Sequence, residues 1–302
     1  NPTYKISCGN QHAVLRKKPS GKLLPSAHAI DREYRVMQAL SKTEVPVPKM
    51  LSYCEDDSIV GTPFYLMSFL DGRVLNDQSL PDLSQSDRGA IYQEMNRVIA
   101  AIHQVDYQAI GLESFGKPGN YFARQVGRWS RQVQDSTIPI PAALTKLMEW
   151  LPHHIPTDDE TTLVHGDFRL DNMIFDHHEN KVIGVLDWEL STLGHPMADF
   201  SYQCMAWRIP PTLWRGIGGL DLIGLGIPSE QEYIRWYETN SSRTIGSDWN
   251  FYMAYNFFRI AAILHGVAQR AVDGNASASD AAENGQKSGL LAEIGLECVG
   301  IA

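Results

Sequence analysis

The sequence predicts an α+β fold with two lobes, a small antiparallel-sheet lobe at the N-terminus and a larger, mainly helical lobe after it. Three observations support this prediction. Short β-rich runs surround one helical segment early in the chain, long segments of helical periodicity follow Asp71-Gly72, and a β-rich hairpin with acidic residues interrupts those helices. We therefore divide the chain into an N-terminal lobe, residues 1–70, and a C-terminal lobe, residues 71–302.

The N-terminal lobe is predicted to open with an antiparallel hairpin. Its strands are residues 3–8 and 13–16, on either side of a turn at Gly9-Asn10-Gln11, because glycine and asparagine favour such turns. Residues 29–40 have the spacing of an amphipathic helix. The apolar residues on one face of this helix are Ile30, Tyr34, Met37 and Leu40.

Prolines 46 and 48 end this helical segment, because proline lacks the N–H group that a helix requires. Residues 58–60 and 64–68 are then predicted to pair as a second hairpin around Gly61-Thr62-Pro63. The chain begins inside a segment that has the character of a strand. We therefore expect a piece of the N-terminus to precede residue 1.

The C-terminal lobe is predicted to consist of long helices around the acidic hairpin. Residues 85–103 carry apolar side chains at helical spacing, at Ile91, Met95, Val98, Ile99 and Ile102. The other helices are expected at 121–134, 142–151, 229–239, 248–272 and 280–298.

Composition excludes several classes of protein. Of the 302 residues, 43% are hydrophobic and 20% are charged, as in ordinary globular proteins. The net charge of -9 argues against a nucleic-acid-binding protein, which would carry a basic face. Four cysteines without a CxxC pair indicate neither a disulfide framework nor a zinc site. Because no leader segment and no uninterrupted apolar span is found, we expect a cytoplasmic protein without membrane contact.

The most informative motif runs from His165 to Asn172. It contains Asp167, four further residues and then Asn172, which is the spacing of a phosphotransfer catalytic loop. In such a loop the Asp accepts the proton of an attacking hydroxyl group and the Asn holds a magnesium ion. A second acid, Asp187, follows the next strand and has the place of the other metal ligand.

The strands around this motif predict how its residues meet. Residues 161–164 lead into the loop, residues 172–175 leave it, and residues 182–186 return as an apolar strand that ends at Asp187. This hairpin would bring Asn172 and Asp187 to the same end, where one Mg²⁺ ion could contact both. The alternative is that the acids are solvated turn residues.

Phosphoryl transfer also requires a cation on the strand that faces the nucleotide, steadied by a helix Glu. Arg16 and Lys17 are both candidates, because side chains alternate across a strand and the inward face is not fixed by the sequence. Glu33 lies at the edge of the apolar face of the predicted helix and can turn inward. Residues 64–70 form a strand that leads into the lobe junction, where the backbone would bind the adenine edge.

Two further groups have predicted structural roles. Asp199, in Pro196-Met197-Ala198-Asp199-Phe200, is expected to brace the catalytic loop through hydrogen bonds. His103 and His165 are expected to be structural.

Three segments carry a resemblance to a known family. They are residues 163–172, Val185-Leu186-Asp187-Trp188-Glu189 and Gly194-His195-Pro196-Met197-Ala198-Asp199. With them, the chain resembles the aminoglycoside phosphotransferase and choline kinase superfamily, whose members have a protein-kinase-like fold. Residues 14–19, 26–34 and Arg128-Trp129 are similar to the branch represented by the N-terminal kinase-like domain of some acyl-CoA dehydrogenases.

The resemblance implies ATP and Mg²⁺ as cofactors and assigns roles by position. Asp167 would be the catalytic base and Asn172 and Asp187 the magnesium ligands. Arg16 falls where the nucleotide Lys is expected and Glu33 where its partner lies, and the hinge would be Ser68, Phe69 and Leu70. Two departures bear on nucleotide affinity: Arg replaces Lys, and only residues 1–4 remain of the loop that covers the phosphates.

That branch includes enzymes that phosphorylate the hydroxyl group of 4-hydroxyacyl-CoA thioesters, so the resemblance implies such an acceptor. Arg128, Arg259 and Arg270 are the candidates for binding the CoA phosphates, out of a set that also includes Arg124, Arg131 and Arg208. The alternatives are an aminoglycoside or amino-alcohol kinase, a catalytically idle binding module, and a metal-dependent phosphoesterase using His165, Asp167 and Asp187. Oligomeric state is not indicated.

Overall fold

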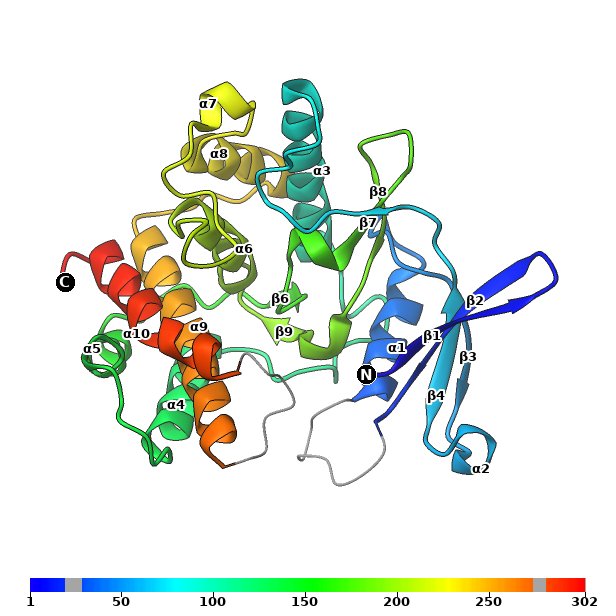
Figure 1. Ribbon diagram of the computed structural model, residues 1–302, viewed down its shortest axis with the longest axis horizontal. Coiled ribbons are helices and arrows are strands. Elements are labelled where there is room, and N and C mark those ends of the chain that lie inside the picture. The colour runs from blue at the N-terminus through cyan, green and yellow to red at the C-terminus, as the bar shows by residue number, and fades with distance from the viewer. Residues whose placement is uncertain (20–28, 274–280, 302) are drawn as a thin grey trace.

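The structure is a computed structural model that describes residues 1–19, 29–273 and 281–301. Its N-terminal part is a four-stranded antiparallel sheet with the strand order β1-β2-β4-β3 (Figure 1). The strands are β1 (Thr3–Cys8), β2 (Gln11–Lys17), β3 (Met50–Cys54) and β4 (Phe64–Ser68). Helix α1 (Ile30–Leu40) lies on the inner side of this sheet and buries the predicted residues Ile30, Met37 and Leu40, together with Glu33.

One prediction for this lobe is wrong. Residues 57–60 form a short helix, α2 (Asp57–Val60), and the strand that pairs with β4 is β3, at Met50–Cys54. The helix is favoured because the Asp56 carboxylate accepts a hydrogen bond from the Ser58 N–H at 2.9 Å, and because Gly61 ends it at a positive φ of 85°. These local caps outweigh the β-branched character of Ile59 and Val60.

The C-terminal part contains two small antiparallel sheets that hold the catalytic hairpin. The first has the order β5-β7-β8, and the second pairs β6 with β9. The strands are β5 (Arg73–Val74), β6 (Thr162–Val164), β7 (Met173–Phe175), β8 (Val182–Val185) and β9 (Thr192–Gly194). The loop at residues 165–172 ends in a 3-10 turn, η2 (Leu170–Asn172). A second 3-10 turn, η3 (Trp188–Leu190), follows Asp187.

The remaining elements are helices that pack around these sheets (Figure 1). They are α3 (Gln85–Gln104), α4 (Tyr121–Gln134), α5 (Ala142–Trp150), α6 (Pro196–Cys204), α7 (Leu222–Leu225), α8 (Glu230–Ser241), α9 (Trp249–Val272) and α10 (Ala281–Cys298), with the 3-10 turns η1 (Leu151–His153) and η4 (Met205–Trp207). The predicted helices are confirmed, whereas α6 and α7 were not predicted. The α+β two-lobe prediction is confirmed as well.

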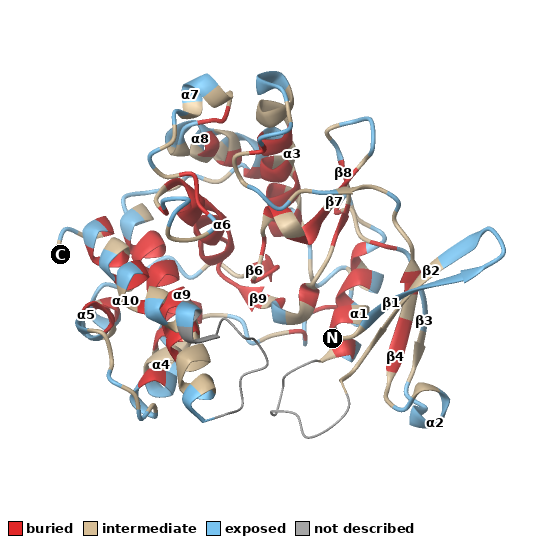
Figure 2. Cartoon of the chain, viewed as in Figure 1, coloured by how far each residue is buried: buried red, intermediate tan, exposed pale blue. Residues whose placement is uncertain are grey.

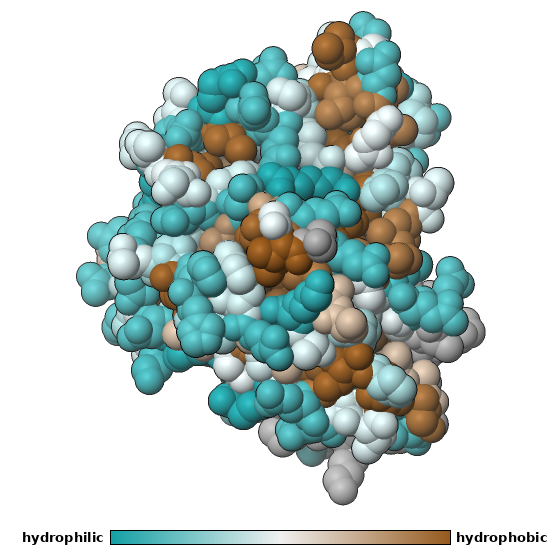
Figure 3. All heavy atoms as spheres, turned by 90° about the vertical axis from the view of Figure 1, so that its left-hand side faces the viewer, coloured by the Kyte–Doolittle hydropathy of each residue, from teal (hydrophilic) through white to brown (hydrophobic). Residues whose placement is uncertain are grey.

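The core lies mainly in this helical part (Figure 2). Helix α9 is buried on nearly every face from Phe251 to Ala262, and β6 is buried at every residue, whereas β1 is exposed throughout. The face seen in Figure 3, on the side of the C-terminus, mixes hydrophilic side chains with separate apolar areas. A search of the described residues found no helix suited to crossing a membrane.

Candidate active site

The catalytic loop is held by a buried acid on the helix behind it. Asp199 on α6 accepts hydrogen bonds from the backbone N–H groups of His165 at 2.6 Å and Gly166 at 2.9 Å, and its Oδ2 lies 3.4 Å from His103 Nε2. Burial raises the pKa of Asp199. The two neighbouring histidines, His103 and His165, and the hydrogen bond from the His165 N–H together lower it by more, so the net shift of the pKa is downward. These hydrogen bonds are of the kind predicted for Asp199 as a brace of the loop.

His165 also has a structural place. Its Nδ1 accepts a hydrogen bond from the Asp167 N–H at 3.2 Å, and its Nε2 lies 2.9 Å from the carbonyl oxygen of Leu186. The first bond requires an unprotonated Nδ1, so Nε2 carries the hydrogen and donates it to Leu186. The ring therefore ties the start of the catalytic loop to the end of β8.

The Asp167 carboxylate is positioned by hydrogen bonds to both oxygens. Tyr202 Oη donates to Oδ1 at 2.7 Å, and Asn172 Nδ2 donates to Oδ2 at 3.1 Å and to the Asp167 carbonyl oxygen at 2.9 Å. Burial raises the pKa of Tyr202, so this hydroxyl stays protonated and acts as a donor. Arg169 Nε lies 3.0 Å from Oδ1 as an ion pair, but its N–H is not aligned for a hydrogen bond.

Asn172 and Asp187 lie at the same end of the β7–β8 hairpin, as predicted. The backbone N–H of Leu186 donates to the Asn172 carbonyl oxygen at 2.8 Å, which fixes the two loops side by side. Asp187 adopts a left-handed conformation with φ 64°, which Asp tolerates better than most residues.

The donor set at this end fits a magnesium ion. Asn172 uses its Nδ2 on Asp167, and its Oδ1 accepts no hydrogen bond from the described part of the chain, so this amide oxygen and the Asp187 carboxylate are oxygen ligands of the type that Mg²⁺ prefers. Within the described ranges, no group of three or more His, Cys, Asp or Glu side chains could hold a metal ion by itself. A phosphoesterase would require such a group.

Arg16 links the sheet lobe to the catalytic hairpin. Its Nε donates to Glu33 Oε2 at 2.9 Å, and its Nη2 donates to Asp187 Oδ1 at 2.8 Å and lies 3.9 Å from Glu189 Oε2. Glu33 is 1% exposed. Burial raises the pKa of Glu33 to about 7, although Arg16 opposes the rise by favouring the charged carboxylate.

Lys17, the other candidate, points away from this cluster. Its Nζ donates to the carbonyl oxygen of Val60 at 2.6 Å, at the far side of the sheet. Because side chains alternate along β2, Arg16 lies on the face of the sheet that meets α1, and Lys17 lies on the other face. The sequence left this choice open because it does not specify which face of β2 meets α1.

The predicted hinge follows the end of β4. Ser68 makes two hydrogen bonds with Lys49. The Ser68 N–H donates to the Lys49 carbonyl oxygen at 2.9 Å, and the Lys49 N–H donates to Ser68 Oγ at 3.0 Å. No hydrogen bond to the backbone of Phe69 or Leu70 is found within the described ranges, so these groups can bind a ligand. The Phe69 ring lies under Lys5 Nζ, 3.9 Å from its centroid.

The three arginines predicted to bind an acceptor differ in burial and in contacts. Arg259 is 8% exposed and donates from Nη2 to the carbonyl oxygen of Gly166 at 2.6 Å, with its guanidinium 5.2 Å from the centre of the Tyr202 ring. Arg128 and Arg270 are exposed, and neither contacts the catalytic loop within the described residues. Arg259 therefore supports the loop, which sequence reasoning did not predict.

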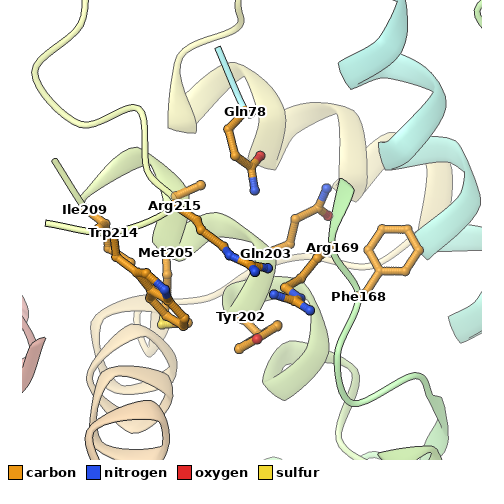
Figure 4. A pocket seen from close by; sticks show the side chains of 10 residues that line it. Gln78, Phe168, Arg169, Tyr202, Gln203, Met205, Ile209, Trp214 and Arg215 are labelled. Atoms are coloured by element: carbon orange, nitrogen blue, oxygen red, sulfur yellow. The ribbon is translucent and has the colours of Figure 1, made fainter. Parts of the chain in front are cut away.

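A cavity is lined by Phe168 and Arg169, which follow Asp167 in the chain, and by Tyr202, which donates to the Asp167 carboxylate (Figure 4). It is small, with a volume of about 30 Å³. Its wall is mostly apolar and aromatic, with four polar side chains, and consists of Gln78, Phe168, Arg169, Tyr202, Gln203, Met205, Ala206, Ile209, Trp214 and Arg215.

Several of these side chains lie at the candidate site although sequence reasoning did not select them. A signal existed for Tyr202, because it stands three residues after Asp199 and so shares a face of α6 with the residue that braces the loop. Arg215 lies in the segment after η4 and pairs with Asp171 at 2.7 Å. Nothing in the sequence indicated that this segment returns to the catalytic loop.

Comparison with known proteins shows the family and the fold. The model of a phosphotransferase enzyme family matches residues 1–226. Acyl-CoA dehydrogenase family member 10 of Mus musculus is 51% identical over 296 residues, which cover 97% of this chain and 28% of the mouse protein. A probable acyl-CoA dehydrogenase of Arabidopsis thaliana is 42% identical over 302 residues, covering 94% of this chain and 37% of that protein. The chain thus spans about a third of the length of these relatives.

Solved structures show the same fold. A putative aminoglycoside phosphotransferase from Ralstonia eutropha JMP134 is 54% identical, with a TM-score of 0.93 over 99% of this chain and 89% of that one. A ternary complex of aminoglycoside phosphotransferase APH(4)-Ia with AMP-PNP and hygromycin B is similar in fold, with 18% identity and a TM-score of 0.61 over 97% of this chain and 90% of that one. The chain therefore belongs to the phosphotransferase enzyme family, as the motifs at 163–172, 185–189 and 194–199 predicted.

Proposed function

We propose that this chain transfers the γ-phosphoryl group of ATP to the hydroxyl group of a small molecule, and we expect it to act in the cytoplasm. The observation that carries the proposal is the placement of Asp167, whose carboxylate is fixed by hydrogen bonds from Tyr202 and Asn172, next to a small cavity that Tyr202 lines. A carboxylate held in one orientation by donors to both of its oxygens is the arrangement that general-base catalysis requires.

Asp167 would orient the acceptor hydroxyl group and remove its proton. Each carboxylate oxygen can accept more than one hydrogen bond, so Asp167 can accept from the substrate while Tyr202 and Asn172 keep their bonds. Arg169 lies beside the same carboxylate without an aligned hydrogen bond, so it can move aside at little loss when the acceptor enters.

A second set of residues would serve the nucleotide. Bound Mg²⁺ and ATP supply the phosphoryl group and neutralise the charge on it. Asn172 and Asp187 would hold the ion, Arg16 would face the phosphates with Glu33 as its partner, and the backbone of residues 68–70 would receive the adenine edge.

A hydroxyacyl thioester is the acceptor that the cavity supports best. None of the residues that line it is Asp or Glu, so it offers no counter-charge to a polycation such as an aminoglycoside. Apolar side chains such as Met205 and Trp214 suit a hydrocarbon chain next to the hydroxyl group. The names of the curated relatives, acyl-CoA dehydrogenase family members, are in line with an acyl-CoA substrate. The exposed Arg128 and Arg270 remain candidates for its phosphates.

The test is acceptor-dependent formation of ADP. A panel of 4-hydroxyacyl-CoAs, amino alcohols, sugars and aminoglycosides is incubated with Mg²⁺ and ATP, and products are followed by ³¹P NMR. We expect a phosphate ester only with acceptors that have a hydroxyl group on an apolar chain, and no product with the same acyl-CoA lacking that hydroxyl. Free phosphate released without any acceptor would instead indicate a hydrolase.

One observation favours a second candidate, an idle binding module. Arg16 replaces the expected Lys and bridges Glu33 and Asp187. The discriminating measurement is the melting temperature with and without Mg²⁺ and ATP. A ligand at ~100 times its dissociation constant adds roughly 2.7 kcal/mol of stability, so no shift at all would support the idle module.

A further inference from the structure

Arg169, in the catalytic loop, has a guanidinium group that makes no hydrogen bond with any described residue. Its Nε lies 3.0 Å from Asp167 Oδ1 without the alignment of a hydrogen bond. Its Nη2 lies 3.6 Å from Asp171 Oδ2, which is beyond hydrogen-bonding distance. A guanidinium carries five N–H donors, and none of those of Arg169 is used within the described part of the chain.

The other arginines at the loop and at Asp187 differ from Arg169, because their side chains donate hydrogen bonds. These bonds run from Arg16 to Glu33 and Asp187, from Arg215 to Asp171, and from Arg259 to the carbonyl oxygen of Gly166. Polar side chains in such positions are usually paired within the protein. Arg169 is therefore the arginine of this group whose donors remain for a ligand.

Neither of the two acids beside this guanidinium depends on it for a hydrogen bond. The Asp167 carboxylate accepts from Tyr202 on one oxygen and from Asn172 on the other. The Asp171 carboxylate accepts from Arg215 at 2.7 Å. The guanidinium can thus turn to a ligand while both carboxylates keep their hydrogen bonds.

Part of the guanidinium is open to solvent. Nε is shielded, but the side chain of Arg169 as a whole is 24% exposed, and Nη1 and Nη2 are in contact with solvent. Burial lowers the pKa of Arg169, but Asp167, Tyr202, Asp171 and Asp187 raise it by more. The charged guanidinium is therefore within electrostatic reach of both the proposed base, Asp167, and the proposed metal ligand, Asp187.

We propose that Arg169 is a catalytic residue that binds the oxygens of the transferring phosphoryl group. The assignment rests on the function proposed above. In that reaction the acceptor oxygen forms a bond to the γ-phosphorus, and the bond from this phosphorus to the ADP oxygen breaks, with its electron pair staying on ADP. The hydroxyl proton passes to Asp167. The negative charge of the transferring group lies on its three outer oxygens, and Nη1 and Nη2 donate to these.

The distances around Asp167 favour this role. A hydroxyl group bonded to the carboxylate has its oxygen about 3 Å away from it. The phosphorus that it attacks lies about 3–3.5 Å from that oxygen. Because Arg169 Nε is 3.0 Å from the same carboxylate, rotation of the side chain is enough to bring its N–H groups to the phosphoryl oxygens. A planar guanidinium can contact two of these oxygens at once.

The first test measures binding without turnover. Calorimetry with Mg²⁺ in an Asp167→Asn background compares ATP with ADP, which differ only in the γ-phosphoryl group. We expect Asp167→Asn/Arg169→Met to lose about 10- to 100-fold of the preference for ATP over ADP, with the affinity for ADP unchanged. An unchanged preference in the double variant would overturn the role of Arg169, and so would equal affinity of ATP and ADP for the Asp167→Asn protein.

The second test measures turnover and thermal unfolding of two variants at position 169. Arg169→Met should lower kcat about 10³-fold, as expected for an arginine that stabilises a transferring phosphoryl group. Its melting temperature should change little, because no hydrogen bond is lost. Arg169→Lys keeps the charge as a compact ammonium group and should recover part of the lost kcat. Arg235→Met, at an exposed position of α8, is the control with wild-type kcat.

Two results of the second test would contradict the catalytic role. One is a kcat of Arg169→Met within about threefold of the wild type, well short of the effect of a catalytic arginine. The other is an equal loss of kcat in Arg169→Met and Arg169→Lys together with a clear fall in melting temperature, which would indicate a structural role.

The two tests separate this inference from the proposed function. If the preference for ATP depends on Arg169 but no acceptor is phosphorylated, the proposed function fails and the contact of Arg169 with the γ-phosphoryl group stands. If the wild type and Arg169→Met phosphorylate an acceptor at equal rates, the proposed function stands and the role of Arg169 is refuted.

Discussion

Arg259 donates a hydrogen bond from Nη2 to the carbonyl oxygen of Gly166 at 2.6 Å, so a residue of α9 holds the peptide that immediately precedes Asp167. Its guanidinium also lies 5.2 Å from the ring centre of Tyr202, the residue that donates to the Asp167 carboxylate. Arg259 thus contacts both supports of the proposed base, and its burial among aromatic residues of α9 has a physical reason.

We predict that Arg259→Met lowers kcat about tenfold or more while changing KM for the acceptor much less. The reason is that its guanidinium supports the loop and is not free to bind substrate, and losing a hydrogen bond to a charged group is typically worth 1.5–3 kcal/mol. Steady-state kinetics with varied acceptor would measure this. Arg235→Met, at an exposed position of α8, is the control. A large rise in KM with kcat unchanged would return Arg259 to the substrate-binding role.

We predict that Asp167→Asn loses about 10²–10⁴-fold in turnover, because an amide cannot take the proton of the acceptor hydroxyl group. Nucleotide binding should persist, since Arg16, Asn172 and Asp187 are unchanged. Single-turnover kinetics together with nucleotide titration would measure both effects. Full activity in this variant would refute the role assigned to Asp167.

We predict that Asp187→Ala abolishes magnesium-dependent binding of ATP. The substitution removes a proposed metal ligand and at the same time a partner of the Arg16 guanidinium, 2.8 Å away. Isothermal titration calorimetry with and without Mg²⁺ would measure the loss. Asp82→Ala, which removes an exposed acid away from the loop, should bind as the wild type does. Retention of magnesium-dependent binding by Asp187→Ala would place the metal elsewhere.

The raised pKa of Glu33 leads us to predict that the free energy of unfolding depends on pH. Burial raises its pKa from 4.5 to about 7, so between these values the folded chain keeps a proton that the unfolded chain releases. Folding then becomes less favourable as pH rises through this window, relative to a variant without the carboxyl group.

The measurement is urea unfolding of the wild type and of Glu33→Gln from pH 4 to pH 8. We expect the free energy of unfolding of the wild type to fall relative to Glu33→Gln by up to about 3 kcal/mol as pH rises. A difference that stays constant with pH would mean that Arg16 keeps Glu33 ionised throughout.

Local signals in the sequence were sufficient for some of these residues. The helix from Ile30 to Leu40 follows from apolar spacing, and that spacing also places Glu33 at its inner edge. Residues 58–60 belong to a helix and not to the expected strand, because the Asp56 carboxylate caps the start of one helical turn and Gly61 ends it. The choice between Arg16 and Lys17 was open until the sheet packed against α1.

The sequence by itself determined the family, the two-lobe α+β fold and the hairpin that brings Asn172 and Asp187 together, because each depends on spacing within short stretches of chain. Only the tertiary structure decided that Arg16 faces Asp187, that Arg259 holds Gly166 and that Tyr202 donates to Asp167. These contacts join residues far apart in the chain, and their geometry depends on how complete elements pack. Neither periodicity nor motif spacing carries that information.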